Sequence, residues 1–256
     1  MKCMVLAGGF AKRMWPLTMD FPKSLLPVAG KPVIDHIIEK IDKLDGLDEI
    51  YVSTNRKFEN VFSKWIRSYQ SKSGSKRVIL IVEPALKEEE KFGSVKAMDY
   101  FIKQYGVKDD ILVIGGDNLF SFDLNDFLRF SNEKKSPVVA FFDVGDVEKV
   151  RGKFGVCVLD GDARITEFQE KPENPKSTLV STCIYRFPEE TLGMISEYLA
   201  DRNNPDAPGH FITWLSRKTP VYGFVSREKW YDIGSRETYK QADAEMRAGK
   251  TKQIIR

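Results

Sequence analysis

The sequence is poor in cysteine and histidine, and this scarcity excludes several classes of site. Its three cysteines, Cys3, Cys157 and Cys183, are scattered and form no CxxC pair. Such spacing disfavours a disulfide framework and a zinc site, and it fits a reducing cytoplasm. The only two histidines are His36, expected on a solvated helix face, and His210, expected in a loop. Acid–base catalysis by histidine is therefore not expected.

Long apolar runs and an excess of one charge are also missing. No window approaches the roughly 18–20 apolar residues that a membrane helix requires, and the first apolar run is too short for a signal peptide. The 40 Lys and Arg nearly balance the 37 Asp and Glu, which leaves a net charge of +3. This balance does not indicate nucleic-acid binding. We therefore expect a soluble, cytoplasmic protein whose partners include neither a membrane nor nucleic acid.

What the sequence does contain is an alternation of short apolar runs with helical patterns. Five runs have the composition of strands that are buried on both faces: Met4–Leu6, Ile50–Ser53, Val78–Val82, Ile111–Ile114 and Val138–Phe142. Their alternation with amphipathic helices predicts an α/β fold with a doubly wound, mostly parallel sheet. The length of 256 residues suits one large domain, and we predict a single domain over the whole chain.

Two helices between these strands have clear apolar faces. The first face spans Val33–Ile41, with Pro32 in the first turn and Gly46 as the expected end of the helix. The second face spans Phe58–Tyr69 at three-and-four spacing. The polar segment SKSGSK, residues 71–76, is expected to end this helix before the next strand.

The second half of the chain has a different pattern of predicted elements. Phe154–Leu159 and Ile165–Phe168 flank an Asp-Gly-Asp turn and predict a β-hairpin, and Cys183–Phe187 predicts a further strand. The final segment, Glu237–Ala248, reads as a helix that stops at Gly249. We expect this half to supply an antiparallel part and one wall of a site.

A glycine pair follows the first predicted strand. Gly8 and Gly9 allow close approaches to the backbone that a side chain would forbid. Ligands of open α/β sheets bind outside the carboxyl ends of the strands, and exposed amides beside Lys12, Arg13 and Lys23 suit a triphosphate. The alternative is a surface turn with solvated charges. The spacing matches neither GxxxxGK[ST] nor GxGxxG, which sets a Rossmann oxidoreductase aside.

The stretch LAGGFAKRMWPLTMDFPKSLLPVAGKP, residues 6–32, resembles the N-terminal signature of the sugar-1-phosphate nucleotidylyltransferases. This family includes glucose-1-phosphate thymidylyltransferase and mannose-1-phosphate guanylyltransferase. Further motifs, FGSVKAM, GGDNLF, FGVCVLD, FQEKP and WYDIGS, extend the resemblance over nearly the whole chain. It implies a Rossmann-like nucleotidyltransferase fold with a nucleotide-binding half, residues 1–142. The antiparallel, sugar-binding half and the C-terminal helix would occupy residues 143–256.

The resemblance also implies a reaction. A sugar-1-phosphate oxygen attacks the α-phosphorus of a nucleoside triphosphate, which releases pyrophosphate and leaves a nucleotide-sugar. Because the nucleophile is already ionised, catalysis reduces to positioning and charge stabilisation. The favoured partners are glucose-1-phosphate with dTTP or UTP, and mannose-1-phosphate with GTP is the alternative. Another alternative is a non-catalytic relative that binds nucleotide-sugar and regulates a partner. Members of the family are often dimers or tetramers, which implies a homo-oligomer.

The resemblance assigns the charged residues of the reaction. Arg13 would grip the β- and γ-phosphates, Lys23 would reach the α-phosphate, and Lys171 would hold the sugar phosphate. Asp117 and Asp232 would bind Mg²⁺, a hard cation that takes oxygen ligands. The alternatives are solvated cations, a turn-forming aspartate and an aspartate that caps a helix.

The nucleotide would lie against a set of residues after the first and third strands: Leu6, Ala7, Gly8, Gly9, Lys12, Glu83, Gly93 and Ser94. Two positions depart from the family pattern. Ala11-Lys12 replaces the usual Gly-Thr, which alters the phosphate loop and adds a cation. Glu83 stands where thymidylyl- and uridylyltransferases commonly have glutamine; an ionised glutamate only accepts hydrogen bonds and would better suit guanine. The choice of base therefore stays open.

The sugar would contact Gly155, Glu170, Lys171 and Cys183. A hairpin glycine and a solvated carboxylate are the alternatives for the first two. Cys183 stands where the family often has glycine, and a larger side chain there is expected to reshape the sugar pocket.

Overall fold

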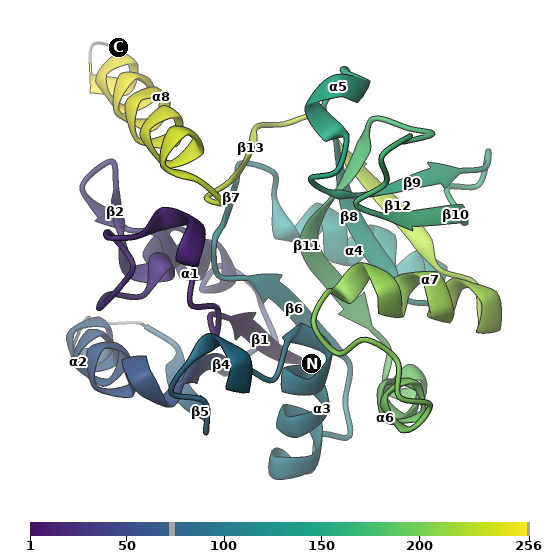
Figure 1. Cartoon of the computed structure of the whole chain (residues 1–256), viewed down its shortest axis with the longest axis horizontal. Helices are drawn as coiled ribbons and strands as arrows, with labels where there is room; N and C mark the ends of the chain where they lie inside the picture. The colour runs from purple at the N-terminus through teal and green to yellow at the C-terminus, as the bar shows by residue number, and fades with distance from the viewer. Residues whose placement is uncertain (72–74, 255–256) are drawn as a thin grey trace.

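The computed structural model describes residues 1–71 and 75–254, and Figure 1 shows its helices packed around a twisted central sheet. The strands are β1 (Lys2–Leu6), β2 (Pro27–Val28), β3 (Lys31–Pro32), β4 (Glu49–Asn55), β5 (Arg77–Glu83), β6 (Ile111–Gly115), β7 (Asn118–Phe120), β8 (Val138–Asp143), β9 (Gly155–Leu159), β10 (Ile165–Glu170), β11 (Leu179–Phe187), β12 (Tyr222–Ser226) and β13 (Trp230–Asp232). The helices are α1 (Val33–Ile41), α2 (Glu59–Gln70), α3 (Ser94–Tyr105), α4 (Leu124–Lys134), α5 (Val147–Val150), α6 (Leu192–Ala200), α7 (Pro208–Lys218) and α8 (Arg236–Ile254).

Among the described residues, nine strands form the central sheet. Its main path runs β10-β9-β11-β6-β1-β4-β5, and β8 joins β11 to β12. Strands β6, β1, β4 and β5 are parallel to one another, whereas β11 is antiparallel to β6 and to β8. All five predicted buried strands are present, and the predicted hairpin is β9-β10. The doubly wound, mostly parallel α/β sheet is therefore confirmed. Strands from both predicted halves of the chain, before and after residue 142, belong to this one sheet.

Alternating side chains of the central strands fill two separate cores. Cys3 and Val5 of β1 point to the face covered by α1 and α2, whereas Met4 between them points to the face covered by α3, α6 and α7. All three are fully buried. Period-2 alternation on a sheet covered on both sides explains why these strands read as continuous apolar runs.

Two of the predicted helix ends were wrong. Helix α1 ends at Ile41, and Gly46 lies beyond it in a turn with φ of 68°. Helix α8 continues through Gly249 to Ile254, because a glycine inside a helix only weakens it unless the chain turns left-handed there. For α2, the predicted end at residues 71–76 lies partly outside the described residues, and the helix itself ends at Gln70.

Neither histidine lies where it was predicted. His36 is half-buried rather than solvated, since its Nε2 lies 2.8 Å from the carbonyl oxygen of Val28. His210 is exposed in the first turn of α7 rather than in a loop.

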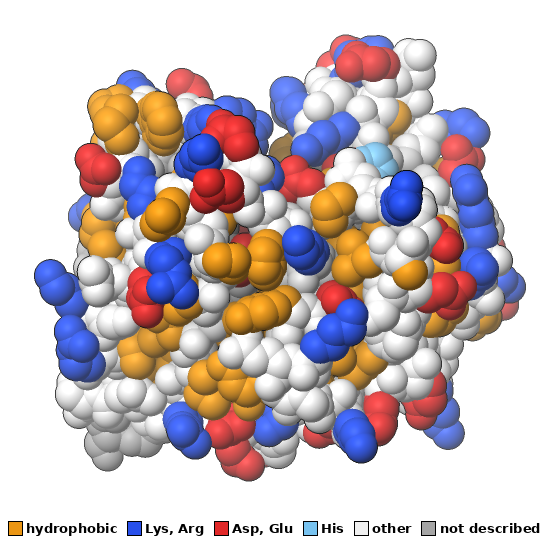
Figure 2. Space-filling model, turned by 60° about the horizontal axis from the view of Figure 1, so that its bottom comes forward, with side chains coloured by type: hydrophobic (Ala, Val, Ile, Leu, Met, Phe, Trp, Pro, Cys, Tyr) orange, Lys and Arg blue, Asp and Glu red, His pale blue; other side chains and the backbone are white. Residues whose placement is uncertain are grey.

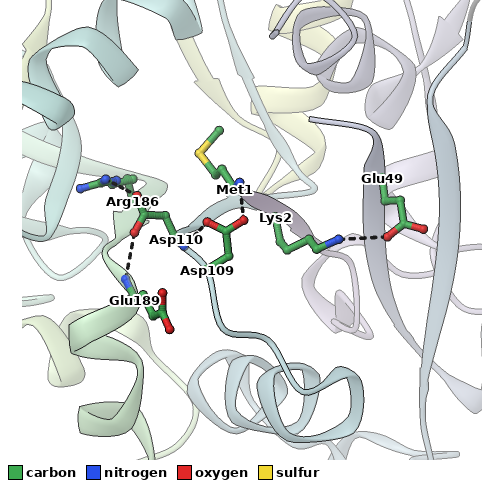
Figure 3. A network of polar contacts seen from close by, with 7 residues as sticks. All are labelled: Met1, Lys2, Glu49, Asp109, Asp110, Arg186 and Glu189. Carbon is green, nitrogen blue, oxygen red and sulfur yellow. Dashed lines mark hydrogen bonds and ion pairs between the residues drawn. The ribbon is translucent and has the colours of Figure 1, made fainter. Parts of the chain in front are cut away.

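A polar network closes the amino end of the parallel strands (Figure 3). The amino group of Met1 lies 2.5 Å from Asp109, and Lys2 pairs with Glu49 at 3.2 Å. Asp110 pairs with the guanidinium of Arg186, which is buried at the end of β11. The backbone N–H of Glu189 donates to the same carboxylate. Bonds to Tyr51 and Lys2 lower the pKa of Glu49, so this end of the sheet neutralises its charges locally.

The surface mixes charges of both signs. Across the face shown in Figure 2, basic and acidic side chains are interspersed among hydrophobic ones, as the net charge of +3 suggests. In the part of the chain that the structure describes, no helix combines the length and apolar character needed to cross a bilayer.

Candidate active site

Two adjoining cavities lie at the carboxyl ends of β1, β5 and β6, where open α/β sheets bind ligands. The first has a volume of about 190 Å³ and the second about 350 Å³. They share the side chains of Asp117 and Cys183 on the sheet side, and Lys91, Asp206 and Pro208 on the loop side. A ligand with two charged parts could therefore span both.

The first cavity brings together most of the residues predicted to bind nucleotide. Its lining includes Leu6, Gly8, Gly9, Glu83, Gly93 and Ser94. Ala7 is buried and takes no part in the lining, and its N–H bonds the carbonyl of Ser53 at 2.8 Å. Lys12 also lies outside the lining, where its Nζ pairs with Glu89 at 3.0 Å.

Of the glycine pair, Gly8 is required by the position of Glu83, whereas a Cβ on Gly9 would meet no atom of the described residues within 4 Å. A Cβ on Gly8 would stand 2.7 Å from Oε1 of Glu83, so a side chain there would collide with the carboxylate. The Gly8 carbonyl also accepts a hydrogen bond from Asn55 at 3.2 Å. Further along the loop, Ala11 takes up the left-handed conformation with φ of 50° that a glycine adopts more easily. The loop thus keeps a glycine-like path at a position that has lost its glycine.

Glu83 is a buried carboxylate held by its neighbours. It is 3% exposed and accepts hydrogen bonds from the hydroxyl of Ser53 and the backbone N–H of Phe92. Burial raises its pKa, although these two bonds and Lys96 oppose the rise. Glu83 therefore ties β4 and the loop before α3 to the wall of the first cavity.

At the start of α3, backbone N–H groups already have hydrogen-bond acceptors within the protein. The N–H groups of Ser94 and Val95 donate to the carbonyls of Asp206 and Pro205, at 3.0 and 2.9 Å. Gly93 has φ of 78°, and a Cβ there would lie 2.5 Å from Cα of Asp206. The amide of Ser94 is thus engaged within the protein, and only its side chain and the neighbouring Gly93 face the cavity.

The second cavity brings together the residues predicted to bind sugar phosphate and metal. Its lining includes Arg13, Asp117, Gly155, Glu170, Lys171, Cys183 and Asp232. Lys23 does not line it but pairs directly with Asp117. Side chains from five separate parts of the sequence therefore meet in one place.

A short ladder aligns the two aspartates. β13 pairs antiparallel with β7 so that Asp232 lies opposite Asn118, and the N–H of Ile233 donates to the Asp117 carbonyl at 3.0 Å. Burial and the neighbouring Asp117 raise the pKa of Asp232 to about 6, although the positive charges of Lys23, Arg13 and Lys171 oppose this rise. Burial alone would lower the pKa of Lys23, but Asp117 and Asp232 together raise it.

These two carboxylates fit a hard divalent cation. Within the described residues, no group of three or more metal-ligating side chains comes together, so the site offers two protein ligands. Mg²⁺ is commonly held by one or two carboxylates together with waters and substrate phosphates. A cation between Asp117 and Asp232 would relieve the repulsion that raises the pKa of Asp232.

The sugar side of the cavity depends on two close approaches. Cβ atoms on Gly155 and Gly209 would lie 2.9 and 1.8 Å from Oε2 of Glu170, so only glycine admits this carboxylate. Burial raises the pKa of Glu170, although Lys171 and His210 oppose the rise. The carboxylate lies beside the amino terminus of α7, where a negative charge is favoured.

Lys171 and Cys183 both adopt left-handed backbone conformations, with φ of 47° and 55°. Cys183 lies where the register of β11 against β8 shifts, and its Cβ would stand 2.9 Å from a Cβ on Gly115. Its side chain lines both cavities. Cys183 therefore borders both cavities rather than the sugar side alone.

The sequence analysis missed several residues of the cavities. Lys91 pairs with Glu88 at 2.8 Å and with Asp206 at 3.0 Å, which joins the loop before α3 to the loop before α7. No motif signals this contact. Asn118, Phe154 and Trp230 were also missed, although they stand in the GGDNLF, FGVCVLD and WYDIGS motifs that could have identified them. The other missed lining residues are Ala97, Gly115, Lys153, Ser181, Tyr185, Asp206, Ala207, Pro208 and Gly209.

Comparison with known proteins agrees with this geometry. The bifunctional protein GlmU of Methanocaldococcus jannaschii is 34% identical over 234 residues, which are 91% of this chain and 51% of that protein. The UTP–glucose-1-phosphate uridylyltransferase AglF of Haloferax volcanii is 29% identical over 187 residues, 73% of this chain and 72% of that protein. The chain spans between about half and two thirds of the length of the first curated relatives it matches.

Solved structures share the fold. One, provisionally named as a glucose-1-phosphate thymidylyltransferase from Bacillus anthracis, superimposes with a TM-score of 0.77 at 25% identity, covering 96% of this chain and 95% of that one. A UDP-glucose pyrophosphorylase complexed with UDP-glucose gives a TM-score of 0.79 at 21% identity, covering 96% and 97%, which supports the fold alone. Residues 2–249 match the sequence model of the family described as Nucleotidyl transferase. The chain therefore belongs to the nucleotidyl transferase family, as its sugar-1-phosphate nucleotidylyltransferase motifs predicted.

Proposed function

We propose that this protein is an active sugar-1-phosphate nucleotidyltransferase. It joins a nucleoside monophosphate from a nucleoside triphosphate to a hexose-1-phosphate and releases pyrophosphate. The observation that carries the proposal is the meeting of Asp117, Asp232 and Lys23 where the two cavities join, with Arg13 and Lys171 beside them. A regulatory relative that only binds nucleotide-sugar would have no chemical need for this whole set.

The two cavities suit two substrates. The first, beside the Gly8-Gly9 turn, takes the base and ribose, and the second, between Glu170 and Gly155, takes the sugar. Glu170 accepts hydrogen bonds from sugar hydroxyls, and Lys171 attracts the sugar phosphate. In this arrangement the two phosphates would lie near each other at the shared wall, and the reaction requires such proximity.

The chemistry exchanges one phosphorus–oxygen bond for another. An oxygen of the sugar phosphate forms a bond to the α-phosphorus, and the bond from that phosphorus to the oxygen bridging to the β-phosphorus breaks. The electron pair of the broken bond leaves with pyrophosphate. Lys23 stabilises charge at the α-phosphate, and Arg13 stabilises charge on the leaving group. No proton transfer is needed, which agrees with the absence of both histidines from the linings of the two cavities.

Asp117 and Asp232 would hold Mg²⁺, which neutralises phosphate oxygens when it is bound. The protein's own part is to hold the two carboxylates next to each other. The β7-β13 ladder provides the adjacency. Lys23 pairs with Asp117 and opposes the rise in the pKa of Asp232.

The favoured base is a pyrimidine, and the favoured sugar phosphate is glucose-1-phosphate. Relatives named for uridylyl transfer to glucose-1-phosphate support this choice. So does the position of Glu83, whose carboxylate already accepts from Ser53 and Phe92 and supports the cavity wall. Guanine is the second candidate, because Glu83 faces the first cavity as an acceptor that suits the N–H donors of guanine.

The test is pyrophosphate release with Mg²⁺ across the nucleoside triphosphates against glucose-, mannose-, galactose- and N-acetylglucosamine-1-phosphate. Asp117→Asn serves as the background control. Turnover in one combination with UTP or dTTP supports the proposal, and turnover with GTP selects the second candidate. Glu83→Gln then tests the base reader, since a guanine reader loses GTP use and a structural glutamate leaves the preference unchanged. Nucleotide-sugar binding without turnover in any combination contradicts the proposed activity.

A further inference from the structure

A chain of hydrogen bonds leads from β13 to the carboxylate of Asp117. The indole Nε1 of Trp230 donates to Oδ1 of Asn118 at 2.9 Å. The amide Nδ2 of Asn118 then donates to Oδ1 of Asp117 at 2.7 Å. The other carboxylate oxygen of Asp117 pairs with Lys23. Both oxygens of this aspartate are therefore held from the protein side.

The order of this chain follows from the chemistry of its members. An indole N–H can only donate, so the amide of Asn118 must turn its oxygen toward Trp230. Its NH₂ group is then left to face Asp117, which receives a donor and not a second acceptor. Without the indole, the amide could rotate by half a turn and present its oxygen to the carboxylate. Trp230 thus decides which end of Asn118 faces Asp117.

Packing and burial hold the indole of Trp230 and the amide of Asn118 in place in this relay of hydrogen bonds from Trp230 through Asn118 to Asp117. The ring of Trp230 contacts Phe142 and Phe154, with ring centroids 5.9 and 5.4 Å apart. Asn118 is only 3% exposed, so water competes weakly for its amide. The ladder that pairs Asp232 with Asn118 fixes the distance between the two strands that carry the relay.

We propose that Trp230 is a positioning residue for the metal site: through Asn118 it sets the orientation of the Asp117 carboxylate toward Asp232. This inference rests on the proposed function of the two aspartates. The three-residue strand β13 then serves the site twice. It carries one carboxylate directly, as Asp232. Through Trp230, two residues before Asp232, it orients the carboxylate of Asp117.

The test is the affinity of the protein for Mn²⁺, measured by electron paramagnetic resonance without sugar phosphate. Trp230→Phe keeps an aromatic ring against Phe142 and Phe154 but removes the N–H donor. Loss of an outer partner of a metal ligand typically weakens metal binding by about 10-fold or more, and we expect a loss of this size. Trp214→Phe is the matched control, because Trp214 packs on Tyr198 of α6 and on Phe211 of its own helix α7. This substitution should leave Mn²⁺ affinity unchanged.

A double-mutant cycle identifies the route. Asn118→Leu removes the middle of the relay with little change in size, and it should weaken Mn²⁺ binding at least as much as Trp230→Phe. Combining the two should add little further loss, because both break the same connection. If Trp230→Phe does not fold, weakened Mn²⁺ binding by a folded Asn118→Leu variant supports the relay, and unchanged binding overturns it.

Other outcomes separate this inference from the proposed function. Unchanged Mn²⁺ affinity in folded Trp230→Phe, or fully additive losses, would overturn the relay even when the wild type releases pyrophosphate. An inactive wild type whose Mn²⁺ binding still depends on Trp230 would retain the relay and refute the activity. A wild type that binds no Mn²⁺ would overturn the relay.

Discussion

The two ends of the central sheet are built in opposite ways. At the amino end, Met1, Lys2 and Arg186 each have an acidic partner that offsets their charge, although Nε and Nη1 of Arg186 are buried without a hydrogen-bond partner among the described residues (Figure 3). At the carboxyl end, Asp232 and Glu170 are carboxylates whose pKa values are raised by burial. Left-handed residues also collect at this end. The difference indicates that one end stabilises the fold, while the other keeps charge available for ligands at some cost in stability.

The largest effect that would sharpen this comparison is on turnover at the carboxyl end. Asp117→Asn removes one of the two proposed metal ligands, and metal ions supply several kcal/mol of transition-state stabilisation, so we expect turnover to fall by at least about 100-fold. Thermal unfolding should stay near the wild-type temperature, because relief of the repulsion with Asp232 offsets the loss of the ion pair with Lys23. Pyrophosphate release and calorimetry on the same samples measure both. Full activity of this variant in the presence of Mg²⁺ would show that Asp117 is not a required metal ligand.

The next effect is on stability at the amino end. Asp110→Ala leaves the guanidinium of Arg186 buried without its carboxylate, which should lower the free energy of unfolding by about 3 kcal/mol. Turnover at low temperature should not change. Urea unfolding checks the loss, and adding Arg186→Met should restore much of it because no buried charge remains. A single variant as stable as the wild type would show that this end does not stabilise the fold as described.

A smaller effect of opposite sign at the two ends should appear in the pH dependence of stability. The pKa of Glu83 is raised in the folded state, so the folded state binds more protons and its stability falls as pH rises through and above 4.5. The pKa of Glu49 is lowered, so its contribution is present above pH 4.5 and is lost as pH falls. Urea unfolding of Glu83→Gln and Glu49→Gln from pH 4 to 7 measures both.

Relative to Glu83→Gln, the wild type should lose stability with rising pH. Relative to Glu49→Gln it should gain stability, by about 0.5 kcal/mol for this partly exposed group. The same slope for both variants would contradict the contrast between the two ends.

The smallest predicted effect concerns backbone strain. Ala11 adopts a left-handed conformation that costs an alanine about 1–2 kcal/mol, and glycine would remove this cost while losing about 0.5–1 kcal/mol through its greater unfolded freedom. Ala11→Gly should therefore stabilise the protein by about 0.5 kcal/mol in urea unfolding. Ala200→Gly, at the end of the ordinary helix α6, should instead destabilise it. Equal losses for both would mean that Ala11 carries no strain.

The sequence predicted those parts of the molecule that rest on local patterns. Continuous apolar runs predicted β1, β4, β5, β6 and β8 correctly, because a sheet covered on both faces buries every side chain in its centre, whereas β12 was missed. The cavities also contain most predicted site residues, among them Glu83, Asp117 and Lys171, because motifs of the resemblance marked them. Their roles in binding and catalysis stay predictions, as do the single domain and the association of copies.

Contacts between distant segments could not be predicted in this way. The three-residue strands β7 and β13 are too short to show a period, yet their pairing brings Asp232 beside Asp117. The pair formed by Lys91 and Asp206 depends on where two loops end, which no local pattern encodes. Gly249 shows the reverse error, since a residue that often ends helices lies inside one.

Cys183 lines both cavities, and under the proposed function this has a consequence for redesign. A substitution at this position that makes room for a bulkier hexose would also alter the space proposed for the nucleotide. Selectivity for the two substrates is therefore not independently adjustable at this position. Libraries that vary residue 183 alone would trade one preference against the other, and orthogonal control would require changes deeper within each compartment, such as at Ser181 or Ser94.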